Sequence, residues 1–257
     1  MNKLNDEVTD SVQPSYSAPA VDKAFEIIDL VAGEMAGLTV TDMAARLGRS
    51  TSQIYRIVVA LHRLDVLHRE EATDRYSLSL KLYEVATRRP PLQRMIHHAT
   101  PILQRLASET DQSCHLAAIT GTSLVILAQA DSPMPMHYTV KLGSSFPAME
   151  TSSGVTIAAF SSQLRQATLL DEFSAPERQK FDERFHQTRQ NGFERRESDV
   201  ATGVINLTKP ILDATQQPLA AITVPFLPQK RMRLTIDEVL EKVIVAADEL
   251  TSIMQKI

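Results

Sequence analysis

The chain lacks several features that define whole classes of protein. Among its 257 residues there are one cysteine and no tryptophan. A single cysteine excludes an internal disulfide, and no apolar run approaches the ~18 residues that a transmembrane helix needs. Residues 1–17 lack the apolar core of a secretory signal, and their composition predicts a disordered tail. We therefore expect a cytoplasmic protein that makes no contact with a membrane.

Motifs that carry chemistry are also scarce. The sequence contains no phosphate-binding loop, dinucleotide-binding fingerprint, zinc-ligand spacing or serine nucleophile elbow, so we predict no metal and no cofactor. Cys114 lies in the apolar run SCHLAAI, where a thiol is more typical of core packing than of a nucleophile. His115, next to it in a strand, would point to the opposite face. His97 and His98 are adjacent on a helix and cannot chelate a metal as an i, i+4 pair does.

Residues 37–80 carry the pattern of a helix-turn-helix. A short first helix ends at Gly48, since glycine tolerates the left-handed backbone that closes a helix. Ser50 precedes Gln53 by three residues, which is the spacing of a capping box at the start of a second helix. In that second helix apolar residues recur every three or four positions and predict one buried face. These residues are Ile54, Ile57, Val58, Leu61 and Leu64.

The opposite face of this second helix is polar and basic, which suits the major groove of DNA. Two short extended runs follow, 66–70 and 75–78, and the polar turn between them predicts the wing of a winged helix-turn-helix. A small three-helix core with solvated arginines is the alternative interpretation. For Tyr55 we weigh a phosphate contact against packing on the wing. The expected DNA-binding residues are Arg49, Thr51, Ser52, Gln53, Tyr55, Arg56 and Arg63.

The charge of the chain is concentrated in this region. The whole chain has a net charge of −4, so it has no global basic field. From Arg46 to Arg69, however, five arginines stand against the single acid Asp65, a local balance of +4. Acids at the wing tip, Glu70, Glu71 and Asp74, would repel phosphates. We therefore expect the wing to contact DNA weakly or to turn away.

The remaining pattern predicts two domains of an α+β protein. A helix over 21–34, with an apolar stripe of Ala24, Phe25, Ile28 and Val31, completes the N-terminal head. After a Pro-containing connection the chain alternates β-prone runs (114–120, 123–130, 137–142, 204–212 and 219–227) with helices (92 or 101–110, 151–160, 176–190 and from 235). Antiparallel hairpins with interspersed helices favour an α+β domain over a parallel doubly wound enzyme. The expected organisation is a tail over 1–17, a winged helix-turn-helix domain over 18–82, a linker over 83–99 and a second domain over 100–257.

Short segments of both domains match a known family in order. They are Gly48 with 52–56, 74–78 at the exit of the wing, 115–117, 141–154, 191–193, 202–204, 209–213 and 218–224. On these segments the chain resembles the IclR family of bacterial transcriptional regulators from about Ala20 to the C-terminus. The resemblance implies a winged-helix head, a linker helix and a GAF-like domain that binds an effector. It also implies dimers, often paired into tetramers, on double-stranded promoter DNA.

The resemblance also implies an effector pocket in the second domain. Residues 151–154 lie at a helix start, where free N–H groups and hydroxyls bind carboxylates or simply cap the helix. By family position Asn206 and Thr223 would face the same cavity, although polar residues are ordinary in sheets. Val140 and Met149 form an apolar wall or plain core. No lysine or arginine matched the pocket, which favours a small organic or aromatic acid. The expected effector-binding residues are Val140, Met149, Thr151, Ser152, Ser153, Gly154, Asn206 and Thr223.

Three functions are weighed. The first is a ligand-responsive regulator, repressor or activator, of catabolic or transport genes. The second is a small-molecule enzyme that uses the head for assembly, and no nucleophile–base or metal constellation supports it. The third is an architectural DNA binder without an effector. Against it, the second domain is far longer than dimerisation alone would require. We therefore predict a regulator that is not an enzyme and has no catalytic residue.

Overall fold

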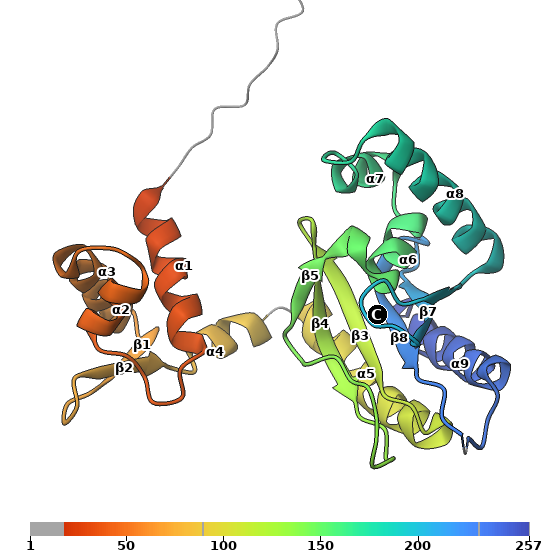
Figure 1. The fold of residues 1–257 in the computed structure, drawn as a ribbon, viewed down its shortest axis with the longest axis horizontal. Helices are drawn as coiled ribbons and strands as arrows, with labels where there is room; N and C mark the ends of the chain where they lie inside the picture. The colour runs from red at the N-terminus through yellow and green to blue at the C-terminus, as the bar shows by residue number, and fades with distance from the viewer. Residues whose placement is uncertain (1–17, 89, 231, 257) are drawn as a thin grey trace, which may run out of the picture. The chain divides into compact units, whose positions relative to one another are not determined.

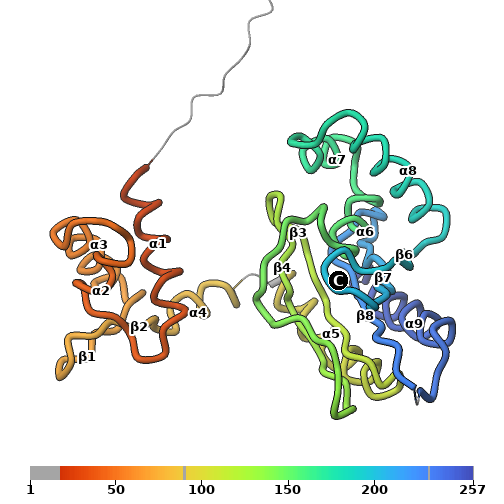
Figure 2. Tube along the Cα trace, in the orientation of Figure 1, coloured from red at the N-terminus to blue at the C-terminus, as the bar shows by residue number. Residues whose placement is uncertain are grey.

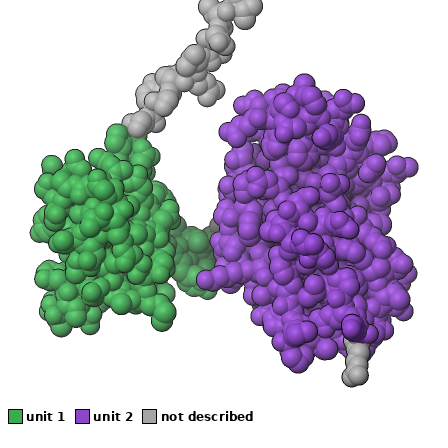
Figure 3. All heavy atoms as spheres, viewed as in Figure 1, with its two compact units in different colours: residues 1–89 green, residues 90–257 purple. Residues whose placement is uncertain are grey.

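The computed structural model describes residues 18–88, 90–230 and 232–256, so the expected tail over 1–17 lies outside the described residues. The chain divides into two compact units, residues 1–89 and residues 90–257 (Figure 3). The division falls inside the segment that was expected to be a linker, 83–99.

The first unit is a helical head with a two-stranded hairpin (Figure 1). One apolar core joins its elements, from Ile27 of the first helix to Ile54 and Val58 of the third and Tyr76 of the hairpin. This arrangement confirms the winged helix-turn-helix. The elements are α1 (Pro19–Ala32), α2 (Val40–Arg46), α3 (Thr51–Arg63), β1 (Leu67–Glu70), β2 (Arg75–Leu78) and α4 (Lys81–Thr87).

Three local expectations about the head were wrong. Phe25 is 58% exposed and Ile27 is buried instead. The stripe that packs on the core is Ala24, Ile27, Ile28 and Val31, at spacings of three and four residues. Leu64 is 57% exposed because α3 ends at Arg63 and the backbone reverses at the next residues. Ser50 is the N-cap of α3, but its hydroxyl lies 3.4 Å from the Ser52 hydroxyl and makes no capping bond.

The second unit is a six-stranded antiparallel sheet covered by helices on both faces (Figures 1 and 2). The strand order is β5-β4-β3-β8-β7-β6, which places β3 and β8 at the centre. The strands are β3 (Cys114–Thr120), β4 (Ser123–Ala130), β5 (Ser145–Pro147), β6 (Glu194–Glu197), β7 (Ile205–Leu212) and β8 (Pro218–Phe226). The helices are α5 (Pro90–Thr110), η1 (Ala148–Glu150), α6 (Ser152–Phe160), α7 (Gln163–Leu169), α8 (Ala175–Asn191) and α9 (Ile236–Met254).

Two apolar clusters fill the space on the two faces of this sheet. On one face α5 and α9 pack through residues such as Leu103 and Val243 against Leu116 and Ile211. On the other face α6 is buried along almost its whole length, and Phe185 of α8 packs beside it. The sheet is therefore sandwiched between helices, and the start of α6 is held directly over the central strands.

The α+β class is confirmed. β3 and β4 are joined by a two-residue turn at 121–122, and α9 begins with a capping box of Thr235 and Glu238. Residues 137–142 do not form the expected strand. The strand is Ser145–Pro147, because the preceding turn carries the chain back so that the backbone N–H of Ile126 bonds the carbonyl of Ser144. The helix α5 starts at Pro90 and passes through Pro101, so residues 90–99 belong to the second unit. The elements α7 and β6 had not been expected.

Candidate functional sites

The exposed face of α3 is the first candidate site. All of the expected α3 residues, namely Thr51, Ser52, Gln53, Tyr55, Arg56 and Arg63, are exposed. Four of them (Thr51, Ser52, Tyr55 and Arg56) border a surface hollow whose other side is formed by α2 and by Arg69, Asp74 and Tyr76 of the wing. Tyr55 therefore lies between the helix and the wing, a position that allows either a phosphate contact or packing on the wing.

Ion pairs within the head divide its arginines into two groups. Arg49, an expected DNA contact, instead holds Glu26 of α1 through Nε and Nη2, at 3.1 and 2.6 Å from Oε2. Arg46 is paired with Glu34, and Arg69 with Asp74. Across the part of the chain that the structure describes, no ion pair involves Arg56 or Arg63. These two guanidinium groups are therefore the cations that α3 presents to solvent without an acidic partner.

The second candidate site is a cavity of about 220 Å³ in the second unit. This is below the usual range for drug-sized ligands. The cavity lies between β3, β4, β7 and β8 on one side and the start of α6 on the other. It is lined by His115, Leu124, Ile126, Tyr138, Thr139, Val140, Lys141, Ser144, Phe146, Glu150, Thr151, Ser152, Ser153, Ser198, Asp199, Val200, Asn206, Thr223 and Pro225.

A chain of neutral polar groups runs beneath this cavity. The hydroxyl of Ser153 lies 2.7 Å from that of Thr223, which lies 3.0 Å from that of Thr208. At the other end Nε2 of His115 lies 3.4 Å from the Ser153 hydroxyl. Burial lowers the pKa of the His115 imidazole from 6.5 to about 4, because an apolar environment disfavours the charged form. At pH 7 the buried floor is therefore uncharged.

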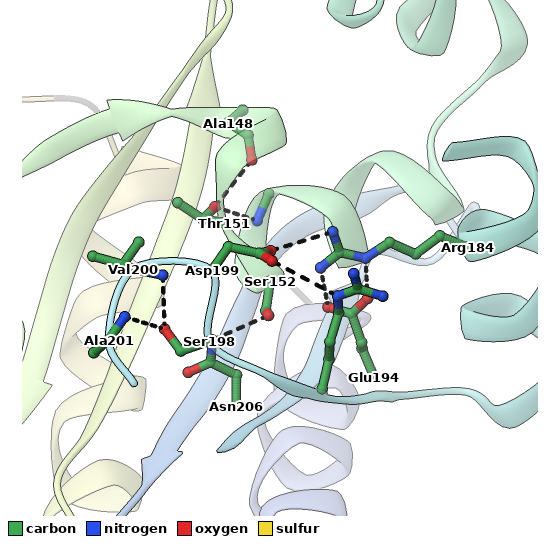
Figure 4. Close-up of polar contacts among 12 residues, drawn as sticks. Ala148, Thr151, Ser152, Arg184, Glu194, Ser198, Asp199, Val200, Ala201 and Asn206 are labelled. Carbon is green, nitrogen blue, oxygen red and sulfur yellow. Dashed lines mark hydrogen bonds and ion pairs between the residues drawn. The ribbon is translucent and has the colours of Figure 1, made fainter. Parts of the chain in front are cut away.

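The start of α6, which carries Ser153, also brings Thr151 and Ser152 to the edge of the cavity (Figure 4). Thr151 caps the helix, since its hydroxyl accepts from the N–H of Gly154 at 3.0 Å and donates to the carbonyl of Ala148. The side-chain amide of Asn206 donates to the hydroxyl of Ser152 at 3.1 Å. N–H groups in the first turn of a helix have no partner within it, and the helix dipole favours an anion there. This end of the cavity therefore suits a negatively charged oxygen.

Residues 198–200 line one side of the cavity, and Figure 4 shows the polar contacts of this segment. The Ser198 hydroxyl accepts from the N–H groups of Val200 and Ala201, each at 3.2 Å. On the outer side Asp199 lies 3.6 Å from Nη1 of Arg184. Arg184 also forms a buried ion pair with Glu194 through two hydrogen bonds of 2.5 and 3.0 Å. The loop that borders the cavity is thus fixed to α8 and β6.

Six of the eight expected effector residues line the cavity, namely Val140, Thr151, Ser152, Ser153, Asn206 and Thr223. The structure places the other two elsewhere. Met149 is buried in the core beside α6, because η1 turns its side chain away from the cavity. Gly154 packs on backbone, since a Cβ added there would lie 1.9 Å from the carbonyl oxygen of Ala148.

Sequence reasoning missed His115 and Lys141, which both line the cavity. The expectation of a pocket without a matched lysine was therefore wrong. Lys141 stands in a segment already matched to the family, 141–143, and that match was the available signal. His115 stands opposite Thr223 across the β3–β8 pair. Only that register brings it to the site, and the sequence does not reveal the register.

An exposed recognition helix with a wing, and an α+β unit with a partly open cavity of mixed polar and apolar lining, define a two-unit protein of the winged helix-turn-helix class. Residues 20–71 match the IclR helix-turn-helix domain, and residues 92–252 match the C-terminal domain of the bacterial transcriptional regulator IclR. The chain belongs to the IclR family of bacterial transcriptional regulators.

Individual relatives are more distant. The chain is 27% identical over 144 residues to the HTH-type transcriptional regulator KdgR of Escherichia coli, which covers 56% of this chain and 54% of that one. The chain spans about half the length of the first curated relatives that it matches. In the described residues no helix is long and apolar enough to cross a membrane, and no group of three potential ligands could hold a metal ion.

Solved structures share the fold over nearly the whole chain. The IclR of Thermotoga maritima has a TM-score of 0.68 at 21% identity and covers 91% of this chain and 98% of that one. An IclR homolog from Microbacterium hydrocarbonoxydans, solved in complex with 4-hydroxybenzoate, has a TM-score of 0.76 at 15% identity and covers 93% and 100%. At such identities the likeness concerns the fold alone.

Proposed function

We propose that this protein is a transcriptional regulator that binds promoter DNA through α3 and changes that binding when a small acid occupies the cavity. The observation that carries the proposal is the presence, in one chain, of an exposed polar recognition helix and a separate cavity that the first turn of α6 borders. Family membership supports this division of labour.

For the DNA contact we propose roles that follow side-chain chemistry. Gln53 can pair with adenine through two hydrogen bonds, and Arg56 can pair with guanine or phosphate. Arg63, ten residues after Gln53 and near the end of α3, would contact the backbone. We also propose that the protein assembles as a homodimer or homotetramer, so that two heads read a symmetric operator. Arg49 is not among the proposed base-reading residues, because Glu26 occupies its guanidinium group.

For the effector we propose a small organic or aromatic carboxylic acid. Its carboxylate would lie at the start of α6, within reach of the flexible ammonium group of Lys141 at the cavity edge. Its body would pack against apolar lining such as Val140 and Phe146. A second, uncharged oxygen would meet His115 and Thr223 on the strands of the sheet. The 4-hydroxybenzoate held by the relative from Microbacterium hydrocarbonoxydans is an acid of this class.

An enzymatic role finds one point of support in the contact between His115 and Ser153. That contact is long, at 3.4 Å, and the Ser153 hydroxyl is engaged at 2.7 Å by Thr223. Within the described residues no carboxylate bonds to His115, so nothing orients the imidazole as a general base. We therefore propose that the chain is not an enzyme and that the cavity only binds its ligand.

The effector proposal is tested by calorimetry of the purified protein against a panel of small carboxylic acids and a panel of neutral sugars of similar size. Heat from the acids alone is expected. Heat from sugars, with none from any acid, would reject the proposed effector class. A Ser152→Ala variant offers a check of location, because it removes the hydroxyl that Asn206 holds at the anion-binding end and should weaken the acid that binds best.

A further inference from the structure

The surface hollow between α3 and the wing contains a guanidinium group that the sequence pattern had not assigned to DNA. Arg56, Arg69 and Asp74 are the charged residues that line this hollow, together with hydroxyl-bearing residues of α2 and α3 such as Thr41 and Ser52. The two arginines therefore face the same space from opposite sides, one from the recognition helix and one from β1 of the wing.

Asp74 currently occupies the guanidinium group of Arg69. Nε and Nη2 of Arg69 lie 3.1 and 2.5 Å from the same carboxylate oxygen of Asp74. Both side chains are well exposed, at 46% and 68%. Exposed pairs of this kind are weak because water and salt screen them, so a stronger anion can take the place of the carboxylate. DNA phosphate is such an anion, with two oxygens that match the fork of a guanidinium group.

We propose that Arg69 is the contact of the wing to a backbone phosphate of DNA, and that Asp74 competes with this phosphate and limits the affinity. The proposal rests on the proposed DNA-binding function of α3. When α3 enters the major groove, the hollow beside it faces the sugar–phosphate backbone. Removal of the Asp74 charge would leave two positive groups, Arg56 and Arg69, around that hollow. The wing then contributes to affinity and carries no base information.

The backbone conformation of Asp74 determines which substitution can test the proposed competition. Asp74 has φ of +54°, in the left-handed region, where aspartate and asparagine are tolerated better than other residues with a side chain. Asp74→Asn therefore keeps the turn and removes only the charge. Glu71→Gln removes an acidic charge from the same turn and is the matched control. Within the described residues Glu71 has no ion-pair partner.

The experiment measures the Kd of the full chain for a labelled 30-bp duplex of random sequence, by fluorescence anisotropy at several salt concentrations. Asp74→Asn is expected to bind about three- to tenfold more tightly at low salt, with a log–log salt slope steeper by about 0.9 for the added phosphate contact. Arg69→Ala is expected to bind more weakly and with a shallower slope. The double variant should bind as Arg69→Ala does, because Asp74 acts only through Arg69.

Three results would overturn the proposal. An unchanged Kd for Asp74→Asn, while the wild-type protein binds the duplex, would show that the wing does not touch DNA and would leave the role of α3 intact. An equal gain for Glu71→Gln, or a gain that persists in the double variant, would show general charge repulsion. Failure of the wild-type protein to bind any duplex would overturn the proposed function and this inference with it. Circular dichroism of each variant confirms that the head is folded.

Discussion

Two pairs of arginine and carboxylate, one in each unit, have the same chemistry and different surroundings. Arg69 and Asp74 in the wing are 46% and 68% exposed, whereas Arg184 and Glu194 in the second unit are 12% and 6% exposed. An exposed pair is weak and can exchange its partner for another anion. A buried pair cannot lose one member without leaving an uncompensated charge. Exposure therefore makes the first pair suited to recognition and the second to holding structure.

The same difference separates the two candidate sites. The DNA-binding face presents its donors to solvent, where a large anionic partner can reach them. The cavity instead has neutral groups at its base, namely the hydroxyls around Ser153 and the uncharged imidazole of His115. Its charged lining residues are the cation Lys141 and the acids Glu150 and Asp199. A small ligand in the cavity would be recognised by hydrogen bonds to these groups, because a buried donor or acceptor that is left without a partner is destabilising.

The largest effect is expected from breaking the buried pair. Arg184→Ala should lower the free energy of unfolding of the second unit by about 3–5 kcal/mol, because Glu194 would remain buried and charged. Chemical denaturation measures this, with Arg69→Ala as the exposed counterpart, for which a change of about 1 kcal/mol or less is expected. Replacing both members of the buried pair, as Arg184→Met with Glu194→Leu, should recover most of the lost free energy of unfolding. Equal losses for Arg184→Ala and Arg69→Ala would refute the contrast.

The buried imidazole should make the stability of the second unit depend on pH. The pKa of His115 is lowered from 6.5 to about 4, so the unfolded chain takes up a proton in that range before the folded chain does. Stability is full above pH 6.5 and falls between pH 6.5 and about 4, by about 3 kcal/mol at 1.36 kcal/mol per pKa unit. His115→Asn should remove this component, whereas His137→Asn at an exposed position should keep it. A stability profile that His115→Asn leaves unchanged would contradict the account.

Substitutions at the two ends of α3 should have different effects on DNA binding, one on sequence preference and the other on overall affinity. Gln53→Ala should lower the preference for the operator over random DNA by about 1–3 kcal/mol, because a base contact is lost. Arg63→Ala should weaken both by the same factor and make the salt slope shallower by about 1. Competition titrations with operator and random duplexes measure both quantities. If Gln53→Ala weakened both DNAs equally, its base-reading role would be rejected.

The smallest effect is expected at the edge of the cavity. Lys141→Gln should weaken the best-binding acid about tenfold, since a hydrogen bond to a charged group is worth about 1.5–3 kcal/mol before solvent screening. Lys242→Gln, on the exposed side of α9, is the control and should leave the affinity unchanged. Calorimetry of both variants with the same acid decides whether the ammonium of Lys141 takes part.

Sequence periodicity was sufficient for features that depend on neighbours along the chain. The exposed face of α3 and the start of α6 both follow from local spacing, so Gln53, Ser152 and Ser153 were placed correctly. Local spacing gives no information where a distant residue decides the partner of a side chain. Arg49 is engaged by Glu26, which belongs to another helix.

The missed members of the cavity have the same cause. His115 reaches the site because β3 pairs with β8 in one particular register, and no local pattern encodes that register. Met149 lies outside the cavity because a single turn, η1, separates β5 from α6 and directs its side chain into the core. Such a turn is too short to show a period in the sequence, so the direction of its side chains depends on the tertiary packing around it.

The central claim is that occupancy of the cavity changes the affinity of α3 for DNA. The most direct test is an anisotropy titration of DNA from the protein's own upstream region, with and without a saturating pool of small carboxylic acids. We expect tight, salt-sensitive binding whose Kd the acids shift by about 5- to 150-fold, the usual range of coupling between two sites. Tight binding with the same Kd in the presence of acids that calorimetry shows to be bound would contradict the claim.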